Sequence, residues 1–211
     1  MRNAGWAPLV AMLAAGPALA EPEAPRAKPA APAESAKALP AERPASPPDA
    51  KPASVRVPPL PQGELLARLR ARLKARASTV YEGWPAQKAI DGDPKTSWFS
   101  ASGDAAALKT APWIEVSFPE DVTIQHVLAL GNREPDWLVN YSIVVARLEL
   151  YDHTGLKLAT QGNETALPTF DIEFHLEAPV PKVRRLRLVS LSDQGDKNPY
   201  RDVAIGELWA W

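Results

Sequence analysis

Residues 113–118, Trp-Ile-Glu-Val-Ser-Phe, alternate apolar and polar side chains. Successive side chains of a β-strand point to opposite faces, so this period of two puts Ile114, Val116 and Phe118 on one buried face. Residues 170–175, Phe-Asp-Ile-Glu-Phe-His, repeat the pattern. Both stretches predict strands that pack on a core through one face only.

Further strand-like stretches fill the chain beyond Ser78, and none has the length and period of a long helix. We expect strands at residues 123–130, 143–152, 156–161, 183–191 and 203–211, with a turn at His153-Thr154-Gly155. About eight strands joined by loops of varied length predict an all-β fold. The expected architecture is an antiparallel jelly-roll β-sandwich over residues 71–211.

The segment before this sandwich fits two periods at once. Four leucines, Leu65, Leu66, Leu69 and Leu73, are spaced as on one helix face, whereas apolar and basic residues alternate from Leu69 to Ala77 as in a strand. We expect a short basic helix or the end of a linker at residues 63–70, followed by the first strand. A basic helix on a membrane surface is the alternative, but its apolar face is short.

Residues 21–62 contain 12 of the 23 prolines of the chain and no aromatic residue. Ala, Glu, Lys and Arg fill the gaps, so this stretch has too little apolar surface to offset the entropy of ordering. We predict a disordered, Pro/Ala-rich linker that acts as a spacer. A proline-rich docking ligand is the alternative.

The first 20 residues have the features of a secretory signal peptide. A positive start at Arg2 precedes the apolar run 9–15, and Ala18-Leu19-Ala20 is a small-x-small cleavage pattern. A membrane anchor is the alternative, but Pro17 interrupts the run and a span needs about 20 residues. We predict cleavage after Ala20, no membrane span in the mature chain, and export to the periplasm or the medium.

The charge balance and the cysteine content exclude several classes of function. The chain has 24 Lys and Arg against 25 Asp and Glu, so no basic excess points to nucleic acid. The absence of cysteine excludes disulfides, thiolate metal sites and cysteine nucleophiles.

No sequence pattern indicates catalysis. The three histidines, His126, His153 and His175, lie far apart without metal-ligand spacing, and nucleophile elbows, phosphate loops and zinc signatures are absent. Paired carboxylates are the one alternative that sequence leaves open, because their separation is not visible in it. We predict a protein that is not an enzyme.

The most specific stretch is residues 89–98, Ala-Ile-Asp-Gly-Asp-Pro-Lys-Thr-Ser-Trp. Two carboxylates and a hydroxyl on one Gly- and Pro-bearing turn place hard oxygens around one point, which suits Ca²⁺. An EF-hand fails because Thr96 and Ser102 stand where Gly and Glu are required. An Asx turn without metal stays open, whereas an Asp-x-Asp sugar-nucleotide site lacks a nucleotide-binding βαβ unit.

Together with Trp113-Ile114-Glu115-Val116 and the closing Asp202-Val203-Ala204-Ile205-Gly206-Glu207-Leu208, this turn resembles the discoidin, or coagulation-factor type C, domain. That family includes the galactose-binding jelly rolls of family 32 carbohydrate-binding modules. The likeness spans roughly residues 71–211. Within the family, residues 131–140 and the strand end at Tyr151-Asp152 are similar to the NADase-type glycan-binding variant.

The resemblance implies a structural Ca²⁺ ion that ties the first loop to the last strand. Its ligands by position are the carbonyls of Lys88 and Gly206 and the side chains of Asp91, Asp93, Thr96 and Glu207. Such an ion constrains a sandwich that has no disulfides.

The resemblance also implies a ligand site in loops at one end of the sandwich. Flat aromatic faces and polar side chains in the candidate loops suit a glycan. The candidate ligand-binding residues are Tyr81, Trp84, Asn132, Arg133, Trp137, Asn140, Tyr200 and Arg201. Trp84 and Trp137 have packing under the loops as an alternative role, whereas we expect Trp98, Trp113 and Trp209 in the core.

These observations predict an exported carbohydrate-binding module on a flexible tether, with a glycan or cell-surface polysaccharide as its partner. One alternative is an adhesion or scaffold protein whose sandwich docks an envelope protein, which would show a wide apolar or charged face. The other is a lipid-surface binder with apolar side chains at its loop tips.

Overall fold

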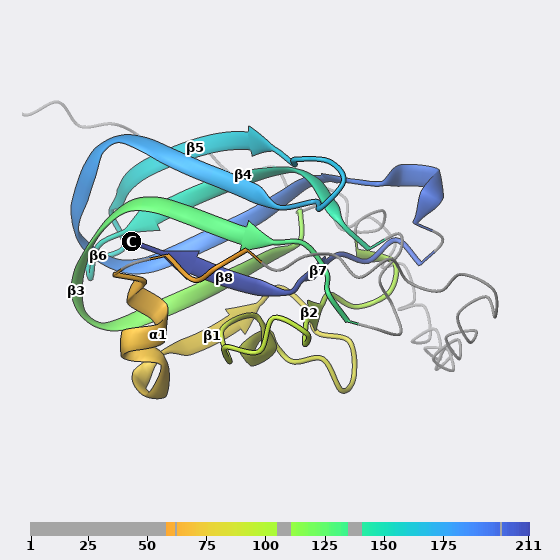
Figure 1. Ribbon diagram of the computed structural model, residues 1–211, viewed down its shortest axis with the longest axis horizontal. Helices are drawn as coiled ribbons and strands as arrows, with labels where there is room; N and C mark the ends of the chain where they lie inside the picture. The colour runs from red at the N-terminus through yellow and green to blue at the C-terminus, as the bar shows by residue number, and fades with distance from the viewer. Residues whose placement is uncertain (1–57, 62, 105–110, 135–140, 199) are drawn as a thin grey trace, which may run out of the picture. The chain divides into compact units, whose positions relative to one another are not determined.

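Two long strands, β3 (Trp113–Leu130) and β6 (Ile172–Asp193), organise the computed structural model (Figure 1). The structure describes residues 58–61, 63–104, 111–134, 141–198 and 200–211. Each long strand belongs to two layers, since its two halves pair with different neighbours. The chain therefore folds as the predicted antiparallel β-sandwich.

The larger layer contains the first half of β3 and the second half of β6. Here β3 pairs with β1 and β6, and β6 continues through β4 to β5. In the smaller layer the second half of β3 lies between β8 and the first half of β6. The other strands of these two layers are β1 (Lys74–Ala77), β4 (Ile143–Tyr151), β5 (Lys157–Glu164) and β8 (Glu207–Ala210).

Both long strands bend where they leave one layer for the other, at the left of Figure 1. The register between them shifts repeatedly from Ser117 to His126, which is the behaviour of β-bulges. Pro119 lies in the bend of β3, and Pro179 and Pro181 lie in that of β6. Proline is tolerated at such bulges because the ladder is already interrupted there.

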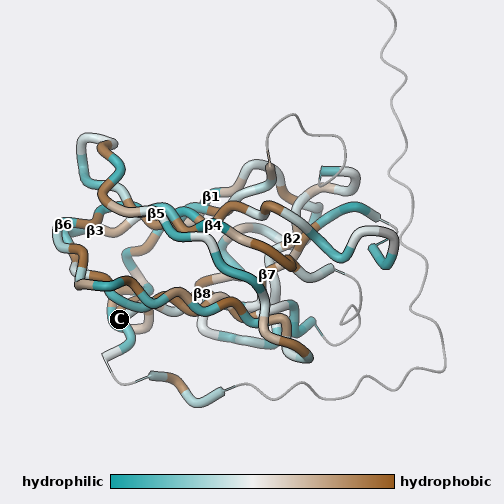
Figure 2. Tube along the Cα trace, turned by 90° about the horizontal axis from the view of Figure 1, so that it is seen from above, coloured by the Kyte–Doolittle hydropathy of each residue, from teal (hydrophilic) through white to brown (hydrophobic). Residues whose placement is uncertain are grey.

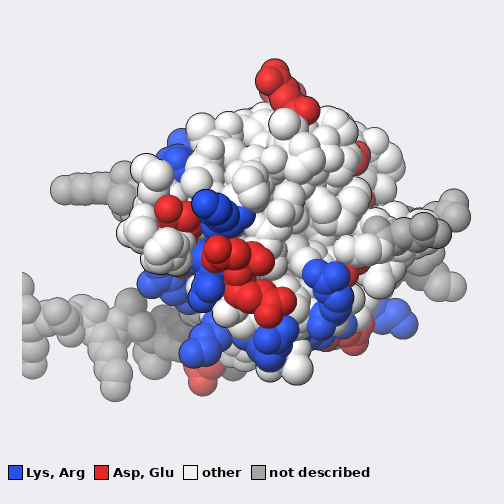
Figure 3. Space-filling view, turned by 90° about the vertical axis from the view of Figure 1, so that its left-hand side faces the viewer, with Lys and Arg blue, Asp and Glu red and all other residues white. Residues whose placement is uncertain are grey.

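This bend carries interspersed charges of both signs (Figure 3). Arg72 lies 3.4 Å from Glu120, and Arg184 lies 3.5 Å from Asp121. Both pairs are largely exposed, so each contributes little to stability. The bend therefore presents no surface of a single sign.

The sequence predicted separate strands at 113–118 and 123–130, and again at 170–175 and 183–191. That division is wrong, because β3 and β6 run through the proline-bearing gaps without a loop. At the start of β6, Phe170 lies outside the strand with a positive φ of 58°. Conversely, the expected strand 203–211 is two short ones, β7 (Ala204–Ile205) and β8.

The core lies between the two layers, and hydrophobic stretches run along β2 (Trp98–Phe99), β4 and β8 (Figure 2). Trp98 and Trp209 are buried, as expected. The expectation for Trp113 is wrong: it is half-buried, with the guanidinium of Arg187 4.4 Å from its ring. Its neighbour Ile114 faces the core, so Trp113 lies on the outer face of the sheet.

A short helix precedes the first strand and packs against the last one. Helix α1 (Leu65–Leu69) is followed by the 3₁₀ turn η1 (Arg70–Arg72), and Leu65, Leu66 and Leu69 are buried in the core. Glu64 caps the helix by accepting from two of its N–H groups, and it also accepts from Ala210 N–H at 3.1 Å. This segment is therefore part of the folded domain.

Candidate functional site

One end of the domain is built from connecting loops, at the right of Figure 1. We define this loop end as residues 79–84, 97–104, 131–134, 141, 198 and 200–204. The two-stranded β2–β7 sheet crosses it, with Phe99 opposite Ala204. Backbone hydrogen bonds join the segments, for example from Ser100 N–H to the Val203 carbonyl at 2.9 Å. The loop end is thus held by the fold.

A chain of aromatic contacts runs through the loop end. Tyr81 contacts Trp84, Trp84 contacts Phe99, and Phe99 contacts Tyr141, with ring centroids 5.3–5.8 Å apart. Tyr200 stacks on Tyr141 at 6.0 Å and an interplanar angle of 13°. Phe99 and Tyr141 are buried, and the other three rings are partly exposed. The two buried rings form the floor of the loop end. The three partly exposed rings, Tyr81, Trp84 and Tyr200, form its aromatic rim.

The structure brings together three predicted ligand residues in that rim, Tyr81, Trp84 and Tyr200. Arg201 follows Tyr200 with a positive φ of 51°, and its N–H donates to the Asn198 carbonyl at 3.2 Å. Trp137 and Asn140 lie outside the described residues.

The polar pair predicted in the neighbouring loop, Asn132 and Arg133, is buried. The Asn132 side-chain oxygen accepts from Ser97 Oγ at 2.7 Å and from Glu134 N–H at 3.0 Å. Arg133 Nη2 lies 2.6 Å from Asp171 Oδ1, and Nη1 donates to the Thr169 carbonyl. Both residues therefore bond to the domain itself, where they hold the loop in place.

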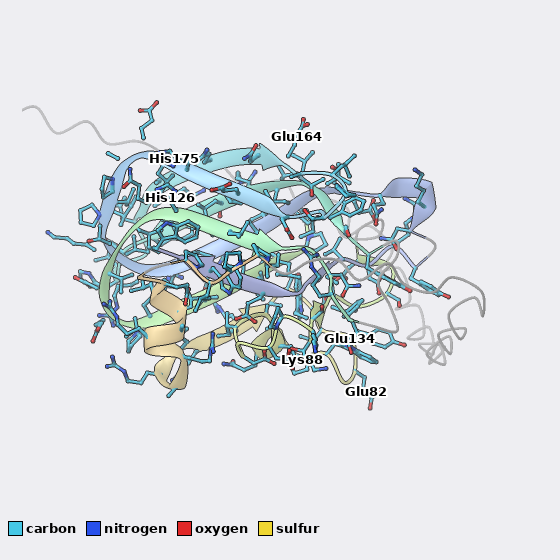
Figure 4. The ribbon with its side chains drawn as sticks, viewed as in Figure 1. Glu82, Lys88, His126, Glu134, Glu164 and His175 are labelled. Carbon is cyan, nitrogen blue, oxygen red and sulfur yellow. The ribbon has the colours of Figure 1, made fainter. Side chains whose placement is uncertain are left out.

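Glu82 and Glu134 at this end were not among the predicted residues, whereas Lys88 was predicted, through its carbonyl, as a calcium ligand. Figure 4 shows Glu82, Lys88 and Glu134 near the loops. Lys88 Nζ lies 5.4 Å from the centre of the Trp84 ring. Glu82 and Glu134 adjoin predicted residues in sequence, which was the available signal. Carboxylates are suited to accept hydrogen bonds from hydroxyl groups.

A buried carboxyl group lies behind the aromatic rim. Burial, and then the charge of Asp202, raise the pKa of Asp104 to about 6. Thr79 Oγ1 donates to Asp104, and Ala101 N–H donates to Thr79 Oγ1 at 3.0 Å. The group is thus fixed within the loop end.

The predicted calcium turn brings oxygen atoms together around Thr96. Thr96 Oγ1 lies 2.8 Å from Asp91 Oδ2, 3.0 Å from the Asp93 carbonyl and 3.4 Å from the Lys88 carbonyl. Asp93 Oδ1 instead accepts from Lys95 N–H at 3.0 Å. The carbonyl of Asp93 therefore lies at the oxygen cluster, while an oxygen of its carboxylate caps the turn.

Glu207 reaches this turn from the last strand. Its side chain is buried and accepts from Gly92 N–H, and Arg70 Nη2 lies 3.6 Å from its Oε1. Burial raises the pKa of Glu207 to about 8, against the opposing effects of Arg70 and the Gly92 N–H. Gly92 has a positive φ of 86°, which favours glycine, and a side chain there would also displace the Arg70 guanidinium.

The donor set fits Ca²⁺, which binds six to eight oxygen ligands in flexible geometry. In the described ranges no three His, Cys, Asp or Glu side chains are grouped for a metal ion. A cation at this turn would therefore take several ligands from carbonyl and hydroxyl oxygens. The Arg70 guanidinium already supplies part of the positive charge near Glu207.

Several solved structures share this fold at low sequence identity. A family 32 carbohydrate-binding module of NanJ from Clostridium perfringens, in complex with galactose, is 15% identical with a TM-score of 0.56, covering 67% of this chain and 95% of that one. A second C. perfringens module, in complex with GalNAc-β-1,3-galactose, is 15% identical with a TM-score of 0.54, covering 68% and 97%. A third, from a family 31 glycoside hydrolase of C. perfringens, is 19% identical with a TM-score of 0.55, covering 70% and 94%.

No curated protein is similar enough in sequence to count as a match. The family model of the F5/8 type C domain matches residues 74–200, which is more than half of the chain. The match contains most of the described strands, the calcium turn and most of the loop end. This chain therefore belongs to the F5/8 type C domain family.

Proposed function

We propose that this protein is an exported, non-catalytic module that binds a carbohydrate at its loop end. The observation that carries the proposal is the aromatic rim of Tyr81, Trp84 and Tyr200 above a buried aromatic floor. Sugar rings present flat C–H faces, which pack on aromatic side chains, while their hydroxyls need polar partners beside them. Glu82, whose side chain is exposed, supplies acceptors at the same end (Figure 4).

The fold supports this assignment because the buried contacts that hold the loops are distinct from the exposed aromatic side chains that would contact a ligand. The Arg133–Asp171 and Ser97–Asn132 contacts fix the loop at residues 131–134 from below. A site with fixed loops loses little conformational entropy when it binds a ligand. The relatives in complex with galactose and GalNAc-β-1,3-galactose make a galactose-containing glycan the first to test.

We further propose that the turn at residues 88–96 holds a structural Ca²⁺ ion. The supporting observation is the convergence of the Thr96 hydroxyl, the Asp91 carboxylate and two carbonyls, next to the buried Glu207. The ion would neutralise these carboxylates and tie the turn to β8. Its role would be to stabilise the fold.

The lipid-surface alternative has weaker support. The large apolar side chains that are exposed among the described residues are Leu60, Val80, Leu156, Leu167 and Leu191. They lie on different segments, and Val80 alone belongs to the loop end. In the described part of the chain, no helix is long and apolar enough to cross a membrane.

Affinity electrophoresis tests the carbohydrate proposal directly. The purified protein runs through native gels with and without a soluble galactose-containing polysaccharide, with calcium in the buffer. We expect the polysaccharide to retard the protein, and free galactose to restore its mobility. Unchanged mobility in a panel of polysaccharides of different sugar composition would contradict the proposal.

A further inference from the structure

Two histidines that are distant in sequence lie side by side on the smaller layer. His126 on β3 and His175 on β6 are direct partners in the register between these strands. Their Nδ1 atoms are 3.0 Å apart, with ring centroids at 4.1 Å and an interplanar angle of 71°. His175 is exposed and His126 is half-buried, and Figure 4 shows the pair at one edge of the domain.

The ring of His126 is held in place by the end of the last strand. It stacks on the Trp211 ring at 5.1 Å with an interplanar angle of only 4°. The two residues also exchange backbone hydrogen bonds, from His126 N–H at 2.8 Å and from Trp211 N–H at 3.1 Å. One of the two imidazoles is therefore fixed before any ligand arrives.

We propose that His126 and His175 bind a divalent transition-metal ion through their Nδ1 atoms. Metal–imidazole bonds of about 2.0–2.1 Å and the observed nitrogen separation give an N–metal–N angle of about 95°. That angle suits two neighbouring positions of a square-planar or tetragonal ion. Cu²⁺ prefers this geometry and has the highest affinity in the first-row series, so Cu²⁺ is the expected ligand.

The rest of the coordination comes from solvent. No third His, Cys, Asp or Glu completes a metal group within the residues that the structure describes. The exposed position of His175 leaves room for water ligands. The pair lies apart from Lys88, the first residue of the calcium turn (Figure 4), and offers nitrogen ligands where that turn offers oxygens. The two sites therefore select different ions.

Without metal, the same contact is an N–H···N hydrogen bond that needs one protonated Nδ1. When both Nδ1 atoms bind a metal ion, that proton moves to Nε2 of the same ring, so the metal ion takes the place of the hydrogen bond. Purified protein in calcium buffer is titrated with Cu²⁺, and the bound ion is followed by electron paramagnetic resonance. Quenching of tryptophan fluorescence gives a second readout, because Trp211 stacks on one ligand.

We expect wild type to bind one Cu²⁺ ion with nitrogen hyperfine structure. His126→Asn and His175→Asn should each weaken Cu²⁺ binding at least about tenfold. Even the loss of a residue that only hydrogen-bonds to a metal ligand lowers metal affinity by about that factor. The matched control is His153→Asn, the exposed third histidine in the β4–β5 turn, which should bind as wild type does.

The altered side chains are at most half-buried, so we expect every variant to fold. Thermal melts of all variants check this. Equal Cu²⁺ affinity and spectra in wild type, His126→Asn and His175→Asn would overturn the proposal. Loss of binding in His153→Asn alone would overturn it too, because the ion would then lie elsewhere.

Discussion

The backbone N–H of Gly92 lies 3.2 Å from both carboxylate oxygens of Glu207, across 115 residues of sequence. This contact ties the turn at residues 88–96 to the start of the last strand, β8. The carboxylate is fully buried, with Arg70 as a nearby cation. Burying a carboxylate costs free energy unless hydrogen bonds and a positive charge compensate it. A calcium ion at the adjoining oxygens would complete that compensation.

The calcium proposal predicts that a chelator destabilises the wild-type protein. An ion that binds only the folded state stabilises it by about 2.7 kcal/mol at a hundredfold excess over Kd. We therefore expect EGTA to lower the melting temperature measured by calorimetry, and elemental analysis to find one bound calcium. Equal melting temperatures with and without EGTA would contradict the proposal.

Two neighbouring carboxylates provide a matched pair of variants for the same turn. Asp91→Asn should abolish the response to EGTA, because Asp91 Oδ2 lies at the oxygen cluster. Asp93→Asn should keep most of that response, since the Asp93 carbonyl lies at Thr96. Equal effects of the two variants would mean that the Asp93 carboxylate binds the ion directly.

The helix before the first strand should contribute to stability like any core element. Leu66→Ala should lower the free energy of unfolding by about 2–5 kcal/mol, as for other large-to-small core substitutions. The control Leu60→Ala, from the same stretch of chain but 53% exposed, should change it by less than about 0.5 kcal/mol. Urea unfolding measures both, and a neutral Leu66→Ala would show that the helix is dispensable.

Asp104 should make stability fall as the pH rises through the acid range. Its pKa of about 6 in the folded protein exceeds the ordinary value of 3.8, so the folded state holds the proton more tightly. Between about pH 4 and pH 6, deprotonation therefore favours unfolding. The side chain in Asp104→Asn cannot ionise. Across this window its free energy of unfolding should therefore rise relative to that of wild type by on the order of 2 kcal/mol.

Urea unfolding at four pH values from 4 to 7 checks that expectation. The control is Glu82→Gln, which removes an exposed carboxyl from the same end of the domain. It shows whether removing any carboxyl group from this end changes the pH profile in the same way. If the free energies of unfolding of wild type and Asp104→Asn changed with pH in parallel, burial would not be raising the pKa of Asp104.

Local patterns were sufficient to predict the fold class but not the length of the strands. Alternation located Ile114 to Phe118 correctly because side chains in a strand alternate whatever their partners are. The predicted strand ended at Phe118, immediately before Pro119, and proline usually interrupts a ladder. In the structure a bulge absorbs Pro119, and the strand continues into the second layer. Only the pairing partners decide between these outcomes.

The candidate sites also differ in how much of each could be predicted from local sequence. The turn from Asp91 to Thr96 is local, so the oxygen atoms that meet at Thr96 could be predicted from the sequence. Arg133 was mistaken for a ligand-facing group, because sequence does not show that Asp171 lies 2.6 Å from it. The His126–His175 pair was missed for the converse reason, since a contact across 49 residues follows from strand register alone.

The aromatic rim predicts which substitutions weaken glycan binding. Tyr81→Ala and Tyr200→Ala should each lower affinity at least about tenfold, the equivalent of losing one aromatic contact of about 1.4 kcal/mol. Both rings are partly exposed, so the melting temperature should fall only modestly. Isothermal titration with the polysaccharide that retards the protein most measures the affinity. Leu191→Ala, exposed on β6, is the control and should bind normally.

A glycan array is the direct test of carbohydrate binding at the loop end. Labelled wild type and the double variant Tyr81→Ala/Tyr200→Ala are applied to the same array in calcium buffer, after melts confirm that both are folded. The account predicts that wild type is retained by a defined set of glycans, with galactose-containing ones among them, and that the variant is not. Retention of neither protein by any glycan, or equal retention of both, would contradict a carbohydrate site at the loop end.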